Sequence, residues 1–297
     1  MRADDLTLER WDRLSAGEKE RTARALSLPA PLTLKGLERC ATLDGERLVA
    51  VFARGDAQFV LLPGGEVVLG HDHGVPLELT DEQHASWDDT ASEYELELEA
   101  FLGQVLRPLH TVVLPPALVE RRSTLLGYTP IEEAHEDACS NRMEFSSGGI
   151  TAVHGGRAYK VEWLTHAQAA EVVASSGFVL PNEDLWEHAC RAGTRTLFRW
   201  GDTCPADCYP IDRCDFDLHR RPNGFGLAIA SNPYEWELCD EPGVLRGGDG
   251  GSMICGGAGF FVGWLPLASA YCDPAGAEWR EQPIPDTRVR RVLLLDL

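Results

Sequence analysis

Several features are absent from this 297-residue sequence, and each absence excludes a class of protein. No run of about 18 apolar residues occurs, so no membrane-spanning helix is expected. The first residues, MRADDLTLERWDRL, contain no apolar stretch of the kind that a secretory signal peptide needs, so we expect a cytoplasmic protein. Positive charge is scarce: 27 lysines and arginines stand against 47 acidic residues. The resulting net charge of −20 argues against nucleic acid and anionic lipid as partners.

The cysteine content gives no disulfide framework. Nine cysteines are an odd number, so at least one has no partner within the chain, and in a reducing compartment most should be free thiols. They are Cys40, Cys139, Cys190, Cys204, Cys208, Cys214, Cys239, Cys255 and Cys272.

The composition that remains is that of a globular protein, with 44% hydrophobic and 25% charged residues. The length suggests one large or two modest domains with a substantial core. The acidic surface has two interpretations. It could attract an arginine-bearing peptide, or it could serve only to keep the protein in solution.

Capping residues and apolar periodicity predict helices in the first two thirds of the chain. Ser15 and Glu18 form a capping box. Gly177 and Gly193 are suited to end helices in the left-handed conformation. The predicted helices are 8–14 after Thr7, 16–26 after Ser15, 80–105, 166–176 after Thr165 and 183–192 after Asn182. The predicted strands are 47–52, a pair in 58–69 joined at Pro63-Gly64-Gly65, 110–114 and 159–163.

The composition changes after Gly193. Glycine and proline become dense, tryptophan and tyrosine recur, and no helical periodicity is found up to Leu297. Such a pattern is typical of a loop-rich α+β domain held together by scattered aromatic side chains.

Several segments, in order, resemble the formylglycine-generating-enzyme (sulfatase-modifying-factor) family. Together they cover roughly four fifths of the chain, and the segment KVEWLTHAQAAEVVASSGFVLPNEDLWEHACRAGTRTLFRWGD gives the strongest match through its LPxExxWExAxRxG–WGD order. The others are FVLLPGGEVVLG, LHTVVLPPALVERRSTLLGYTPI, PNGFGLAIASNPYEWELCDE, VLRGG and SAYCDP.

The resemblance implies an irregular C-type-lectin-like α+β fold over residues 58–297, preceded by an N-terminal helical and strand extension, residues 1–57. In this fold the helices near 165–176 and 182–192 are expected to pack together. The resemblance also implies that most of the hallmark residues have structural roles in the core and in turns. These residues are Trp186, Trp200, Trp236, Gly201 and Asp202.

Enzymes of the family oxidise a peptidyl cysteine to formylglycine with oxygen and a copper(I) ion held by two cysteines, five residues apart in a GGSxxC…C segment. The resemblance makes Cys255 the candidate first ligand, but Phe260 stands where the second cysteine belongs. Cys272 is the only later cysteine and could act as a rearranged partner.

Three functions therefore remain open. The chain is a binding or accessory domain without formylglycine chemistry, a copper-dependent oxidoreductase that uses Cys255 and Cys272 on a peptide or protein substrate, or a protein with another activity on this fold. The sulfoxide-synthase relatives are a poor model, because no histidine precedes His71.

Other metal sites are also conceivable. In the family the GNxWEW segment binds calcium, and Asn232 and Glu235 in SNPYEW retain two potential ligands. Cys204, Cys208, Cys214 and His219 have the residue types of a Cys3His zinc site, although the spacing favours ordinary loop thiols. His71 and His73 resemble an i, i+2 ligand pair, a pattern that is more often a loop. The glycine-rich run 247–259 lacks the Lys-Ser/Thr and the helix of a phosphate loop.

Overall fold

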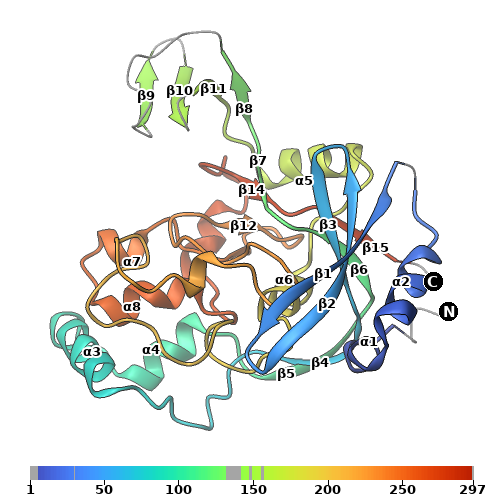
Figure 1. Ribbon diagram of the computed structural model, residues 1–297. Helices are drawn as coiled ribbons and strands as arrows, with labels where there is room; N and C mark the ends of the chain where they lie inside the picture. Colours follow the sequence, from blue (N-terminus) through green and yellow to red (C-terminus); the bar gives the residue numbers. More distant parts are fainter. Residues whose placement is uncertain (1–5, 30, 132–141, 147–148, 155–156, 296–297) are drawn as a thin grey trace.

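A computed structural model describes residues 6–29, 31–131, 142–146, 149–154 and 157–295 (Figure 1). The protein is a mixed α+β structure in which nearly all strand pairs are antiparallel, so the predicted fold class is confirmed at this level. Within these residues, no helix combines the length and the apolar character needed to cross a bilayer.

The largest sheet has five strands in the order β1-β2-β3-β6-β15. Its strands are β1 (Thr33–Thr42), β2 (Gly45–Arg54), β3 (Ala57–Leu62), β6 (Ala117–Glu120) and β15 (Val292–Leu294). β1 and β2 come from the segment 1–57. They pair with each other, and β2 also pairs with β3.

Both faces of this sheet are covered, and alternate residues of each strand enter different cores. Val49 and Val51 pack in one cluster with α6 (Glu183–Arg191), whereas Ala50 and Phe52 pack in another with α5 (His166–Ser175). The prediction that these two helices pack together is therefore wrong, because they pack on opposite faces of the sheet.

The predicted caps are confirmed. Thr7 accepts a hydrogen bond at the start of α1 (Leu8–Arg13), and Ser15 and Glu18 form a reciprocal capping box on α2 (Ala16–Arg24). Thr165 forms a second capping box on α5, and Asn182 caps α6 by accepting from Leu185 N at 2.8 Å. Local chemistry thus determines where these helices begin.

The single helix predicted over 80–105 is instead two helices, α3 (Asp81–Tyr94) and α4 (Leu98–Val105). The chain turns at Glu95, which has a left-handed φ of 53°. Tyr94 is exposed as a result, while Phe101, Leu102 and Val105 are buried in a third core cluster. That cluster also contains the buried residues of α8 (Phe260–Trp264).

Both strands predicted over 58–69 are present, but they do not pair with each other, because they join different sheets. β3 pairs with β2 and β6, whereas β4 (Gly65–Leu69) pairs with β5 (His110–Leu114). Gly64 allows the chain before β4 to approach the end of β5 closely, since a Cβ atom at position 64 would lie 2.3 Å from the Leu114 carbonyl oxygen. The predicted strand 110–114 is confirmed as β5.

The C-terminal part holds only short elements, as the lack of periodicity indicates. A sheet with the order β13-β12-β14-β7 is formed by two-residue strands: β7 (Thr124–Leu125), β12 (Glu237–Leu238), β13 (Leu245–Arg246) and β14 (Arg288–Val289). The remaining helices are α7 (Ser252–Cys255), η2 (Leu218–Arg220), η3 (Leu265–Leu267) and η4 (Pro274–Trp279).

A further four-stranded sheet projects from the body at the top of Figure 1, and we call it the flap. Its strand order is β8-β11-β10-β9, and the strands are β8 (Tyr128–Pro130), β9 (Arg142–Ser146), β10 (Gly149–His154) and β11 (Arg157–Val161). The strand predicted over 159–163 corresponds to β11, shifted by two residues.

Candidate functional site

The thiol of Cys255 is exposed at the end of α7. Its sulfur lies 3.3 Å from the hydroxyl oxygen of Tyr234. This contact raises the pKa of Tyr234 to about 12, and partial burial adds to the effect. The phenol therefore keeps its proton at neutral pH.

Cys272 has different neighbours. Its backbone N–H donates to the Val105 carbonyl at 2.8 Å, and its half-buried thiol lies within hydrogen-bonding reach of Glu183. Burial raises the pKa of Cys272, and the Glu183 carboxylate adds to the effect. A copper(I) site requires thiolates, and the raised pKa of Cys272 disfavours the thiolate form of that residue.

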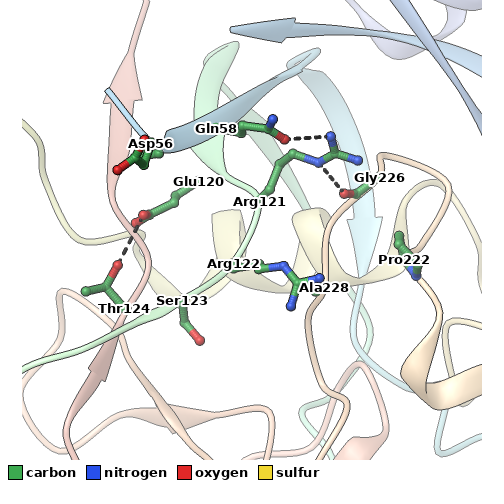
Figure 2. A pocket seen from close by; sticks show the side chains of 11 residues that line it. Asp56, Gln58, Glu120, Arg121, Arg122, Ser123, Thr124, Pro222, Gly226 and Ala228 are labelled. Atoms are coloured by element: carbon green, nitrogen blue, oxygen red, sulfur yellow. Dashed lines mark hydrogen bonds between the residues drawn. The ribbon is translucent and has the colours of Figure 1, made fainter. Parts of the chain in front are cut away.

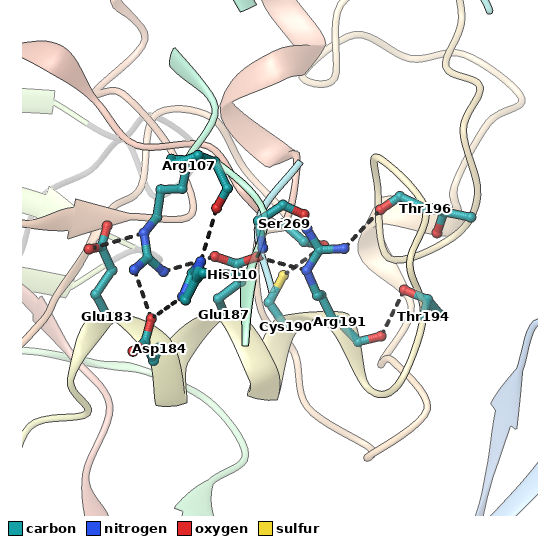
Figure 3. A network of polar contacts seen from close by, with 12 residues as sticks. Arg107, His110, Glu183, Asp184, Glu187, Cys190, Arg191, Thr194, Thr196 and Ser269 are labelled. Atoms are coloured by element: carbon teal, nitrogen blue, oxygen red, sulfur yellow. Dashed lines mark hydrogen bonds and ion pairs between the residues drawn. The ribbon is translucent and has the colours of Figure 1, made fainter. Parts of the chain in front are cut away.

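Glu183, the carboxylate next to Cys272, belongs to a network of ion pairs centred on α6 (Figure 3). Arg107 pairs with Glu183, Asp184 and Glu187 at 3.2, 2.7 and 3.0 Å. Arg246 contacts two of the same carboxylates, and Arg191 lies 2.8 Å from Glu187.

Glu187 is fully buried at the centre of the network. Burial alone would raise the pKa of Glu187, but Arg246 and Arg191 outweigh it and lower the pKa, so the carboxylate stays ionised. Glu187 also accepts from the Gly70 N–H at 2.6 Å. Each of these charges has a partner, so the network ties α6 to the segment before β5 and to β13.

The two predicted calcium ligands lie together but are already occupied. Asn232 accepts from the Tyr234 N–H at 3.1 Å through its side-chain oxygen, and Glu235 pairs with Arg288 at 3.0 Å. A divalent cation at Glu235 would stand beside the Arg288 guanidinium. The side chains present therefore fit a calcium ion poorly.

The residues of the conceivable zinc site are dispersed. Cys204 lies against Gln83, with the sulfur 3.4 Å from Nε2, and Cys208 lies next to Cys214. The Nε2 atom of His219 contacts the Pro210 carbonyl at 2.9 Å. In the described part of the chain, no three His, Cys, Asp or Glu side chains form a group that could hold a metal. Cys139 lies outside that part.

The histidine pair after β4 is close, with ring centroids of His71 and His73 5.1 Å apart in an edge-on arrangement. His73 uses its Nε2 atom to contact the Leu106 carbonyl at 3.1 Å. Burial lowers the pKa of His71, and its neighbour His73 lowers it further. The pair belongs to no metal-binding group in the described residues.

A groove gives a clearer candidate site. Its first part is a cavity of about 440 Å³ between the start of β3, the chain after β6 and the segment 222–228 (Figure 2). Arg121 is held in its wall by the Gln58 side chain at 2.9 Å and by the Gly226 carbonyl at 3.1 Å. Arg122, the next residue, extends into the cavity without a bond to any side chain drawn there (Figure 2).

Two further cavities continue from the first. One of about 290 Å³ shares Arg122, Ser123 and Ala228 with it. The next, of about 300 Å³, shares Asn232, Glu235 and Arg288 with the second and extends to Tyr128, Met143 and Tyr234. We call these three adjoining cavities the Arg122 groove. It ends between the flap and the body, and its last wall contains the tyrosine that contacts Cys255.

The charged walls of the groove are largely neutralised. Glu120 pairs with Arg291, Glu235 with Arg288, and Glu237 with Arg290 at 2.6 Å. Asp286 accepts a hydrogen bond from the Tyr128 hydroxyl. The groove is therefore a polar surface whose charged walls are held by ion pairs.

Sequence reasoning found Asn232 and Glu235 but missed Arg122, Ser123, Tyr234 and Arg288. The Arg121-Arg122 pair after a buried strand is a signal that could have been used, because neighbouring residues of an extended chain face opposite sides. Nothing in the sequence indicates that segments near residues 58, 122, 228 and 288 meet. Comparison with models of known protein families found no match, and a search of the curated proteins found none either.

Proposed function

We propose that this chain is a divergent relative of the formylglycine-generating enzymes, with a C-type-lectin-like domain, and that it acts as a peptide-binding or accessory protein without formylglycine chemistry. The ordered series of family-like segments and the mixed α+β fold support the relationship. The observation that carries the function is the Arg122 groove, which runs past the predicted ligand residues to Tyr234.

The chemistry argues against the family reaction. Copper(I) needs two protein thiolates before the substrate thiol arrives, and Phe260 stands at the family position of the second cysteine. Cys255 has a tyrosine hydroxyl as its neighbour, and Cys272 adjoins a carboxylate.

The test is equilibrium binding of a degenerate decapeptide pool, with the retained peptides identified by mass spectrometry. Ser231 lines the middle cavity, so Ser231→Trp should block the groove and prevent retention. Ser175→Trp, on the exposed end of α5, is the matched control and should bind as the unaltered protein does. Retention by Ser231→Trp equal to that of the unaltered protein, or no retention by any form, would exclude peptide binding in the groove.

A second candidate function is a thiol oxidoreductase acting on a peptidyl cysteine through Cys255 with Cys272. The observation in its favour is the exposed thiol of Cys255 beside a residue that lines the groove. We expect no aldehyde when a Cys-x-Pro-x-Arg peptide is incubated with copper(I), oxygen and the protein. Turnover that disappears in both Cys255→Ser and Cys272→Ser would establish the oxidoreductase instead.

Calcium binding at Asn232 and Glu235 has its own test. Because Arg288 already neutralises Glu235, we expect millimolar calcium to leave the melting temperature unchanged. A rise in melting temperature that a chelator reverses and that Asn232→Ala abolishes would show a calcium site.

A further inference from the structure

Arg122 differs from the other basic residues of the groove. Its neighbour Arg121 pairs with Glu38 at 2.8 Å, and Arg288 pairs with Glu235. Among the residues that the structure describes, the guanidinium of Arg122 has no hydrogen-bond or ion-pair partner. It is nevertheless part of the lining of both the first and the second cavity.

The backbone beneath Arg122 is fixed. Arg122 forms a parallel bridge with Ala228, and the Ala228 N–H donates to the Arg121 carbonyl at 2.9 Å. The buried side chain of Arg290 donates to the Ala228 carbonyl at 2.8 Å and to the Glu120 carbonyl at 2.5 Å. The backbone that carries the Arg122 side chain is thus held in place from both sides.

The polar side chains near Arg122 do not reach its guanidinium. Ser123 lines the same two cavities, but its hydroxyl points away from the guanidinium (Figure 2). The nearby carboxylate of Glu120 is held by Arg291 and by the Thr124 hydroxyl. It turns toward Thr124 rather than toward Arg122 (Figure 2). Asp56 lies at the opposite side of the cavity (Figure 2).

We propose that Arg122 forms an anion subsite, so that the groove selects a peptide carrying an acidic group. The inference rests on the proposed peptide binding and names its ligand class. A guanidinium offers two parallel donors that match a carboxylate or a phosphate. The net charge of −20 would by itself repel an acidic peptide. Salt screens that long-range repulsion, whereas the contact with Arg122 acts over a short distance.

The probes are fluorescein-labelled octapeptides of alanine and serine, all with an amidated C-terminus, that carry one central Glu, Gln, Lys or phosphoserine. A fifth peptide has no central charge and a free C-terminal carboxylate. Their dissociation constants are measured by fluorescence anisotropy. A charge-assisted hydrogen bond should make the best anionic peptide bind roughly ten-fold more tightly than the Gln peptide. The anionic peptide with the lowest dissociation constant shows whether the group bound is a side-chain carboxylate, a phosphate or a C-terminal carboxylate.

Two exposed arginines allow a matched comparison. Arg122→Gln should remove the preference for the anionic peptides, whereas Arg213→Gln, the same change of charge outside the groove, should keep it. Equal binding of every anionic arm and the Gln peptide, a preference that survives Arg122→Gln, or tightest binding of the Lys peptide would overturn the anion subsite while leaving peptide binding intact. Failure of every peptide to bind would instead reject the proposed function itself.

Discussion

At the scale of single residues, the hallmark tryptophan is the best-predicted feature. Trp186 is fully buried, and its indole N–H donates to Glu237 at 2.9 Å. The guanidinium of Arg246 lies 5.2 Å from its ring centroid. Gly247 packs so closely that a Cβ atom there would lie 2.9 Å from the ring. The motif could predict burial, but not these partners, which come from distant segments.

Trp186→Ala should lower the free energy of unfolding by roughly 3–5 kcal/mol, because it leaves a large cavity and removes a buried hydrogen bond to Glu237. Denaturant titration measures the loss. Trp279→Ala, at a half-buried position, should cost less. A loss below about 1 kcal/mol for Trp186→Ala would show that the resemblance is superficial.

His188 should make stability depend on pH. It is almost fully buried, its Nε2 contacts the Pro63 carbonyl at 2.9 Å, and burial lowers its pKa to about 4. In the unfolded chain a histidine takes up its proton near pH 6.5, before the folded protein does. Stability should therefore fall as the pH is lowered from about 6.5 to about 4, by up to roughly 1.4 kcal/mol per pH unit.

The variant His188→Gln, which keeps a donor for the Pro63 carbonyl, should reduce this slope. His84→Gln, at an exposed position in α3, should leave it unchanged. Unfolding free energies at several pH values between 4.5 and 6.5 measure both. Equal slopes for the unaltered protein and His188→Gln would contradict the assignment.

At the scale of elements, helix starts could be predicted and sheet partners could not. A cap is a contact within four residues, so the capping roles of Ser15, Thr165 and Asn182 can be recognised in the sequence. Strand pairing joins distant segments, and β4 leaves β3 for β5, about 45 residues later in the chain. β1 was missed because its residues are mostly exposed or half-buried and show no clear alternation.

The break between α3 and α4 was missed because Glu95 carries no turn signal. Its φ of 53° is costly for a residue with a Cβ atom, so Glu95→Gly should stabilise the protein by up to about 1 kcal/mol. Glu93→Gly, two residues earlier inside α3, should cost about the same amount. Thermal or denaturant unfolding of the two variants compares them directly, and destabilisation by Glu95→Gly would contradict the left-handed turn.

At the scale of the whole molecule, the Arg122 groove shows why the candidate site could not be predicted from the sequence. Its walls come from the start of β3, the chain after β6, the segment 226–237, the flap and β14. Local patterns identified Asn232 and Glu235 through the family-like SNPYEW segment. Arg122 becomes a candidate only when folding pairs the neighbouring charges and leaves its guanidinium without a partner.

The most direct measurement of peptide binding is hydrogen–deuterium exchange of the protein with and without a retained peptide at saturation. The account predicts slower exchange in 120–124, 226–235 and 285–289, which line the groove, and no change in the buried strand 48–53. Unchanged exchange in all three groove segments, or protection confined to other parts of the chain, would contradict the assignment of the Arg122 groove as the binding site.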